Sequence, residues 1–167
     1  MKKILVVGGA GYIGGYLSDL LLRSGHDITV YDNLMFETRY LKDINFIYGD
    51  IREREKLLTI LKDFNIVVWL AAIVGDGACA VDPALTRTIN EDSIKWLVDN
   101  YEGKIVFTST CSVYGIHDHL IDEDAEFNPQ SVYASTKLAA EKYIIENCDD
   151  YLIFRLGTLF GVGDNFS

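Results

Sequence analysis

A tyrosine and a lysine stand four residues apart in the segment Tyr133-Ala134-Ser135-Thr136-Lys137. One helical turn separates such positions, so on a helix both side chains lie on one face. A free tyrosine has a pKa of about 10, too high for a base at neutral pH, and a neighbouring ammonium lowers that pKa by favouring the phenolate. The pair is therefore a candidate acid/base. The alternative is a surface tyrosine beside a solvated lysine, because a chance match is expected among 10 tyrosines and 15 lysines and arginines.

Hydroxyl side chains precede this pair in the segment 107–115, which reads FTSTCSVYG and follows a predicted strand at Ile105–Thr108. A hydroxyl at the end of that strand is suited to hydrogen-bond the substrate oxygen that Tyr133 protonates or deprotonates. Hydroxyls at strand ends also serve as loop caps. The segment gains a catalytic interpretation only through Tyr133 and Lys137 downstream.

A glycine cluster near the start of the chain matches two phosphate-loop patterns. Residues 9–14 read G-x-G-x-x-G, and Gly8, Gly11 and Gly14 form G-x-x-G-x-x-G. A strand precedes the cluster and an amphipathic helix follows it, which is the context that the motif requires. Gly8 permits a tight turn, Gly11 lets the backbone approach a pyrophosphate, and Gly14 lets the helix pack closely on the strand. The helix N-terminus then offers free N–H groups to the anion. Without that context, the cluster is also compatible with a simple turn.

The next strand ends in Tyr31-Asp32-Asn33, and Asp32 lies 18 residues past Gly14. A carboxylate at this distance accepts hydrogen bonds from an adenosine ribose and repels a 2′-phosphate, so Asp32 favours NAD over NADP. The alternative is that Asp32 only caps the following turn. Two further strand ends belong to the same rim: Gly49-Asp50-Ile51 and Ala71-Ala72 are candidates for adenine and ribose contacts, and Asp50 is equally suited to cap a helix.

Apolar runs of strand length alternate with helix-period segments along the whole chain. Strands are predicted at Ile4–Val7, Ile28–Tyr31, Ile44–Tyr48, Ile66–Ala72, Ile105–Thr108 and Leu152–Leu156. Helices are predicted from Tyr12 to Gly25 and at Ile51–Phe64, Pro83–Asn100 and Val132–Cys148. Strands that are apolar on both faces and separated by helices indicate a parallel sheet covered on both sides. The expected fold class is α/β, a doubly wound parallel Rossmann sheet of about six strands with helices on both faces, in one domain over residues 1–167.

Composition narrows the function classes. A net charge of −10 argues against nucleic acid or an anionic membrane surface as a partner. The opening MKKILVV resembles the start of a secretory signal, but its apolar run ends after four residues, and no apolar run reaches the roughly 18 residues of a membrane span. The three cysteines lack metal-ligand spacing and are expected to be free thiols in the cytoplasm.

Taken together, these segments carry a family resemblance. The motifs GGAGYIG, YDNL, GDI, WLAA, Ile89-Asn90, FTSTCSVYG, YASTK and FRLGTLFG run over the whole chain. The chain resembles the extended short-chain dehydrogenases/reductases, the NAD-dependent epimerase/dehydratase group that acts on nucleotide sugars. The resemblance implies hydride transfer between a sugar carbon, usually C4, and the nicotinamide of NAD.

The resemblance also implies residue roles. Tyr133 is the expected acid/base, Lys137 its pKa-lowering and ribose-binding partner, and Thr110 the catalytic hydroxyl. Asn90 is expected near the active-site water network and the cofactor. The expected cofactor-binding residues are Gly8, Gly11, Tyr12, Ile13, Gly14, Asp32, Asn33, Asp50, Ile51, Ala71, Ala72, Asn90, Thr108, Tyr133 and Lys137, and no metal ligands are expected.

The chain departs from individual members of that group. Where the 4,6-dehydratases carry Thr-Asp-Glu, this chain has Thr110-Cys111-Ser112, so the acid and base for water elimination are absent. Where the galactose 4-epimerases usually have Asn three residues after the arginine of the sixth strand, Arg155 is followed by Leu156-Gly157-Thr158. These departures disfavour a 4,6-dehydratase and leave the sugar open.

Family members usually continue for more than a hundred residues beyond this segment, into a domain that holds the nucleotide-diphosphate sugar. We therefore expect residues 1–167 to form the NAD-binding Rossmann domain without that substrate domain, and to turn over weakly alone. A homodimer through the helices at 83–100 and 132–148 is expected from the resemblance. Two other functions remain open: a non-catalytic NAD-binding sensor or scaffold module, and a reductase of a small carbonyl substrate.

Overall fold

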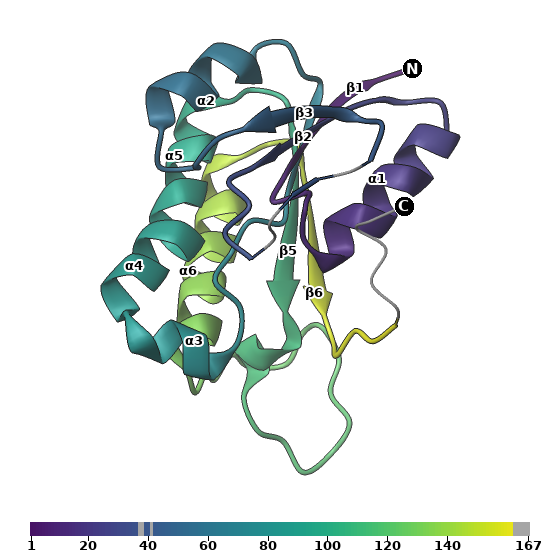
Figure 1. Cartoon of the computed structure of the whole chain (residues 1–167). Helices are drawn as coiled ribbons and strands as arrows, with labels where there is room; N and C mark the ends of the chain where they lie inside the picture. Colours follow the sequence, from purple (N-terminus) through teal and green to yellow (C-terminus); the bar gives the residue numbers. More distant parts are fainter. Residues whose placement is uncertain (37–38, 41, 162–167) are drawn as a thin grey trace.

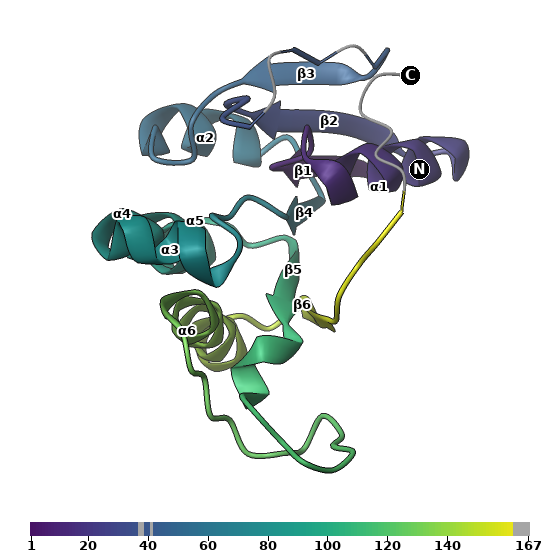
Figure 2. The ribbon, with the colours of Figure 1, turned by 60° about the horizontal axis from the view of Figure 1, so that its bottom comes forward.

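The computed structural model describes residues 1–36, 39–40 and 42–161, and its centre is a six-stranded parallel sheet. The strands are β1 (Lys3–Val7), β2 (Asp27–Asp32), β3 (Asn45–Tyr48), β4 (Ile66–Trp69), β5 (Lys104–Thr110) and β6 (Tyr151–Leu156). Their order is β3-β2-β1-β4-β5-β6, which Figure 2 shows from top to bottom. After β3 the chain returns across β1 to begin the second half of the sheet. The doubly wound Rossmann fold is thus confirmed.

Two apolar layers cover the sheet because successive strand side chains point to opposite faces. Leu5 and Val7 of β1 pack toward α2 (Arg54–Leu61), α5 (Ser93–Asn100) and α6 (Val132–Asn147). Ile4 and Val6 pack on the other face, toward Leu17 and Leu21 of α1 (Tyr12–Arg23). Figure 1 places α1 on one side of the sheet and α2, α5 and α6 on the other.

On the α1 side, the apolar side chains of the sheet are buried at some strands and exposed at others. Leu152 and Phe154 of β6 point to this side and are 43 % and 46 % exposed. The buried apolar side chains on this face come from β1, β2 and β4. Among the described residues, this leaves an apolar sheet face at β6. No helix in the described part of the chain is long and apolar enough to cross a membrane.

The predicted helix over residues 83–100 is interrupted in its middle. It begins as α4 (Pro83–Arg87), widens into a π-helical turn at Thr88–Asp92, and continues as α5. The wider turn adds a residue to the helical ladder and shifts the face that later residues present. Asn90 lies in this turn and is buried in the molecule. A short helix that the sequence did not predict, α3 (Asp76–Val81), precedes α4 and follows Gly75 at φ +92°.

Two elements are shorter than the sequence pattern indicates. β4 ends at Trp69 instead of Ala72, because the N–H groups of Leu70 and Ala71 both donate to the carbonyl of Val7, at 2.8 and 3.0 Å. The helix expected from Ile51 begins only at Arg54, after a turn in which the N–H of Glu53 donates to the carbonyl of Asp50 at 2.9 Å. Apolar periodicity continues through these turns, so it overestimates both elements.

Candidate active site

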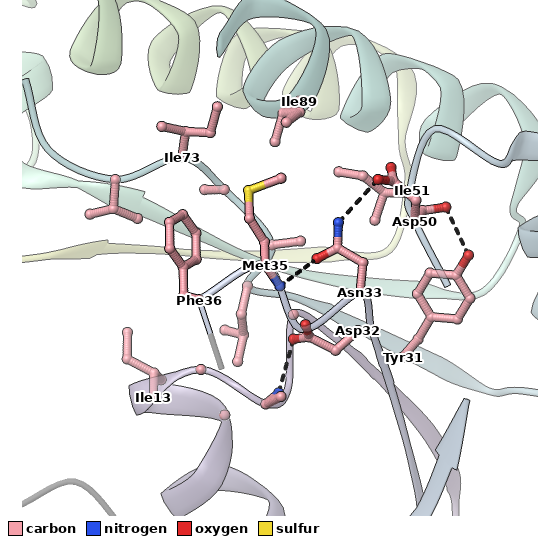
Figure 3. Close-up of a pocket in the computed structure, with 18 of the residues that line it drawn as sticks. Ile13, Tyr31, Asp32, Asn33, Met35, Phe36, Asp50, Ile51, Ile73 and Ile89 are labelled. Carbon is pink, nitrogen blue, oxygen red and sulfur yellow. Dashed lines mark hydrogen bonds between the residues drawn. The ribbon is translucent and has the colours of Figure 1, made fainter. Parts of the chain in front are cut away.

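A cleft of about 540 Å³ opens at the carboxyl ends of β1, β2, β3 and β4. Figure 3 looks into it. Eleven of the sequence-predicted cofactor residues line it, namely Gly8, Gly11, Tyr12, Ile13, Gly14, Asp32, Asn33, Asp50, Ile51, Ala71 and Ala72. Carboxyl ends of parallel strands meet at one edge of a sheet, which is why residues from four separate segments converge here.

The glycine loop forms the floor of the cleft and has little room for side chains. Gly8 adopts φ +79°, and a Cβ there would lie 2.4 Å from the backbone nitrogen of Ala71. A Cβ at Gly14 would lie 2.4 Å from the carbonyl oxygen of Gly9, so α1 approaches the loop backbone closely. Helix α1 begins at Tyr12 after Gly11, and no side chain caps its free N–H groups. These groups are available to an anion such as a pyrophosphate.

Asp32 lies beside this loop at the end of β2. Its Oδ2 accepts a hydrogen bond from the N–H of Ala10 at 3.0 Å (Figure 3). Its Oδ1 accepts one from the N–H of Leu34 at 2.8 Å. The turn-capping interpretation is therefore correct in part. Each carboxylate oxygen has a second lone pair, so Asp32 can still accept from a ribose hydroxyl.

The opposite wall is held by contacts around Asp50. Its carboxylate accepts from Nη2 of Arg52 at 2.7 Å and from Nδ2 of Asn33 at 3.0 Å. The hydrogen bond from Arg52 is the largest cause that holds the pKa of Asp50 well below its usual range. The hydroxyl of Tyr31 donates to the Asp50 carbonyl at 2.8 Å, and burial raises the pKa of Tyr31 to about 12. These contacts fix the Asp50 backbone as a rigid edge for a flat ligand group.

Two apolar side chains that the sequence analysis did not select also line the cleft. Met35 and Phe36 follow Asn33 and are largely exposed. Figure 3 shows Met35 and Phe36 among the side chains that line the cleft, with Phe36 between Ile73 and Ile13 in this view. The signal in the sequence was the run of large apolar residues Leu34-Met35-Phe36 after Asp32-Asn33, in a loop outside the apolar strands and helices.

The candidate acid/base residues, Tyr133 and Lys137, lie at the same edge of the sheet. Tyr133 is the second residue of α6, whose first turn is capped by Ser131 through a bond of 3.1 Å from the N–H of Ala134. Thr110 ends β5 and forms a hydrogen bond with Tyr133 that lowers its pKa. Thr110 also accepts from the N–H of Ser112 at 3.1 Å, so it is both a loop cap and a partner of Tyr133.

Burial governs the protonation of both members of the pair. Burial is the largest cause that raises the pKa of Tyr133, and it outweighs the lowering effect of the hydrogen bond between Tyr133 and Thr110. The pKa of Tyr133 is therefore raised in the protein alone, and its lowering by Lys137 together with a bound nicotinamide stays a prediction. Lys137 is 2 % exposed, which excludes the solvated alternative, and its Nζ lies 4.2 Å from the centre of the Phe107 ring. Burial lowers the pKa of Lys137 to about 7.

Comparison with known proteins decides the family. Residues 4–167 match the model of the NAD dependent epimerase/dehydratase family. The chain belongs to this family.

Similar proteins within the NAD dependent epimerase/dehydratase family carry related names. A UDP-glucose 4-epimerase of Halalkalibacterium halodurans is 35 % identical over 147 residues, which are 83 % of this chain and 44 % of that protein. A putative UDP-glucose 4-epimerase of Methanocaldococcus jannaschii is 34 % identical over 152 residues, 84 % of this chain and 49 % of that protein. The chain thus spans about half the length of the curated relatives that it matches.

Solved structures give the same family and fold. The UDP-glucose 4-epimerase of Brucella ovis in complex with NAD has a TM-score of 0.85 at 30 % identity, covering 93 % of this chain and 51 % of that one. The UDP-glucuronic acid 4-epimerase of Bacillus cereus in complex with NAD has a TM-score of 0.83 at 28 % identity, covering 98 % and 58 %. The resemblance inferred from the sequence motifs is confirmed.

Two residues expected at the cofactor contact other parts of the epimerase/dehydratase fold. The Asn90 amide accepts from the N–H of Ile73 at 2.8 Å and donates to the carbonyl of Ile73 at 2.9 Å. Asn90 therefore positions Ile73, which lines the cleft. Thr108 donates to the carbonyl of Trp69 at 3.2 Å. Direct cofactor contacts of Asn90 and Thr108 stay predictions.

Two cysteines lie close enough to Tyr133 to affect the pKa of its hydroxyl. Cys79 is buried in α3, Cys111 is exposed next to Thr110, and both raise the pKa of Tyr133 electrostatically. All three cysteines, including Cys148, are free, as expected. In the part of the chain that the structure describes, no three His, Cys, Asp or Glu residues are grouped to hold a metal ion.

Proposed function

We propose that this chain is the cofactor-binding and catalytic portion of an NAD-dependent nucleotide-sugar 4-epimerase. The observation that carries the proposal is the convergence of Thr110, Tyr133 and buried Lys137 at the edge of the sheet that also holds the glycine loop. Relatives and structural neighbours named as UDP-glucose and UDP-glucuronic acid 4-epimerases support a UDP-sugar as the substrate class. Cys111 and Ser112, in place of a dehydratase acid and base, favour epimerisation over dehydration.

The residues of the cleft fit NAD. The N-terminal amides of α1 suit the pyrophosphate, Asp32 suits a ribose with free hydroxyls, and apolar residues around Ile51 suit the flat adenine. A 2′-phosphate would meet the Asp32 carboxylate, so NAD is the proposed form and NADP the rejected one.

The chemistry follows from the three catalytic residues. Bound NAD supplies a nicotinamide ring that takes a hydride from a sugar carbon and returns it. Tyr133 takes the proton from the sugar hydroxyl as that carbon is oxidised and gives it back on reduction. The hydrogen bond between Thr110 and Tyr133 favours the phenolate. We propose that the Lys137 ammonium, one helical turn away, stabilises the negative charge that Tyr133 acquires.

We further propose that residues 1–167 act as one NAD-binding domain. Since the relatives are about twice as long, substrate contacts available to the whole protein are expected to exceed those of this chain. Remote contacts position a substrate for reaction, so turnover by this chain alone is proposed to be weak. A homodimer through 83–100 and 132–148 is proposed from the family resemblance, and α5 and α6 of these two segments pack side by side in the chain. Free thiols suit a proposed cytoplasmic location.

Calorimetry with NAD and NADP, followed by turnover assays on UDP-glucose, tests the proposal. We expect NAD to bind at least tenfold more tightly than NADP, and a preference for NADP would refute the role of Asp32. Tyr133→Phe is expected to abolish turnover and keep NAD binding. Tyr143→Phe, which removes an exposed hydroxyl on the same helix, is the matched control and leaves both unchanged.

The alternatives give different results in the same assays. In a non-catalytic NAD sensor, UDP-glucose is not turned over and Tyr133→Phe leaves NAD-dependent behaviour intact. Robust turnover by the 167-residue chain would contradict the proposal of weak activity alone. Light scattering after size exclusion distinguishes the proposed dimer from a monomer.

A further inference from the structure

Glu141 lies one helical turn beyond Lys137 on α6, and its side chain faces the same side of the helix. The two side chains are 1 % and 2 % exposed, so both ionisable groups sit out of contact with water. We propose that Glu141 is a positioning residue whose carboxylate favours the protonated form of Lys137 inside the buried site. The charge of Lys137 is measurable without cofactor or substrate. Only the significance of Glu141 for catalysis rests on the proposed function.

The surroundings of Lys137 explain why it needs such a partner. Glu141 from α6 and Cys79 from α3 act electrostatically on Lys137, whose Nζ lies over the Phe107 ring of β5, and Tyr133 lies one helical turn before it on α6. Tyr133 and Cys79 are neutral near pH 7 because burial raises the pKa of each. Burial alone drives an ammonium toward the neutral amine. Glu141 is therefore the group that carries the opposing negative charge, and its effect is to raise the pKa of Lys137.

The hydrogen bonding of Glu141 leaves part of the carboxylate unused. Its Oε1 accepts from both Nε and Nη2 of Arg155 on β6. Its Oε2 is buried and has no hydrogen-bond partner among the described residues. A buried acceptor without a partner costs stability, so an interaction with Arg155 alone does not account for a full carboxylate at this position.

Arg155 holds the carboxylate in place from the other side. Its Nη1 donates to the Tyr114 hydroxyl at 2.5 Å and to the Glu123 carbonyl at 3.0 Å, and its guanidinium carbon lies 4.8 Å from the centre of the Phe127 ring. Arg155 is thereby tied to the segment between β5 and α6 and cannot move away from Glu141 freely. In the alternative interpretation, Glu141 serves only as the ion-pair partner of Arg155 and does not affect the pKa of Lys137.

The pKa of Lys137 separates the two interpretations. The chain is labelled with lysine carrying ¹³C at Cε, and the Lys137 signal is assigned by its absence from Lys137→Met. Glu141→Gln is chosen because the amide keeps an oxygen that accepts from Arg155 and removes only the charge. We expect the Lys137 pKa to fall by at least one unit, a tenfold change in the protonation equilibrium. A pKa within 0.3 units of the unmodified chain would overturn the proposal.

A matched control and a second variant complete the test. Glu146→Gln removes an exposed carboxylate from the same helix and is expected to leave the Lys137 pKa unchanged. If Glu141→Gln fails to fold, the double variant Glu141→Gln/Arg155→Met removes the ion pair as a unit, so that no buried cation is left unpaired. The double variant is expected to lower the Lys137 pKa by at least one unit as well. An unchanged pKa there would also overturn the proposal.

The result is independent of the proposed epimerase activity. If the chain binds no NAD and turns over no sugar, the titration of Lys137 still confirms or overturns the role of Glu141. If the Lys137 pKa falls as expected while calorimetry finds no NAD binding, the function is wrong and the positioning role stands.

Discussion

The backbone N–H of Ala10 donates a hydrogen bond of 3.0 Å to the Asp32 carboxylate, across 22 positions of sequence. This bond ties the end of β2 to the glycine loop that follows β1. The acid that selects the ribose and the amides that receive the pyrophosphate are therefore held at a fixed separation in the proposed NAD site.

Asp32→Ala is expected to weaken NAD binding by roughly 10- to 100-fold. The substitution removes charge-assisted hydrogen bonds, each worth about 1.5–3 kcal/mol, and frees the Ala10 end of the loop. Calorimetry provides the measurement. Asp27→Ala, at the opposite end of the same strand, is the control and should bind NAD normally. Undiminished NAD affinity in Asp32→Ala would rule out the ribose assignment.

Gly14→Ala is expected to destabilise the fold by about 1–3 kcal/mol, because the added Cβ would meet the backbone of Gly9 at 2.4 Å. A backbone atom cannot move aside as a side chain can, so α1 itself must shift and NAD binding should weaken too. Urea unfolding measures the loss. Gly77→Ala, in α3 with nothing within 4 Å of the new Cβ, should be neutral or stabilising by up to about 1 kcal/mol. Equal behaviour of the two variants would contradict the close packing at Gly14.

Asn90→Ala is expected to cost about 2–4 kcal/mol, since it leaves both the N–H and the carbonyl of Ile73 without their partner in a buried position. Asn100→Ala also removes a side-chain bond to a backbone carbonyl, but at an exposed site, and should cost less than about 1 kcal/mol. The comparison by urea unfolding isolates the effect of burial. A cost for Asn90→Ala as small as that of Asn100→Ala would show that Asn90 does not hold the loop.

Stability is expected to rise with pH above neutrality because of Lys137. Its pKa is about 7 in the folded chain, against about 10.4 when unfolded, so between these values only the unfolded state binds the proton. Each pH unit then adds up to about 1.4 kcal/mol to the free energy of unfolding. In Lys137→Met this contribution disappears. The gain in stability from pH 7 to pH 9 should therefore be larger in the unmodified chain, by up to about 2 kcal/mol. Parallel pH profiles of the two proteins would refute a buried, titrating Lys137.

Most strands, and the helices that join them, were predictable from the sequence alone. Apolar runs such as Ile4–Val7 and Ile28–Tyr31 are local signals, and so is the helix that follows the glycine loop. The misses occur where local periodicity meets a tertiary contact. The π-helical turn around Asn90 exists because its amide binds the backbone of Ile73, which lies 17 positions earlier in the chain.

The sequence by itself determined the order of elements, the phosphate loop and the spacing of Tyr133 and Lys137, because each is carried by neighbours along the chain. Only the tertiary structure decided that Lys137 is buried against Phe107 and that Glu141 forms an ion pair with Arg155. It also decided that Met35 and Phe36 line the cleft. These facts depend on which distant residues exclude water from one another. Burial sets the charge of a side chain, and no local pattern records it.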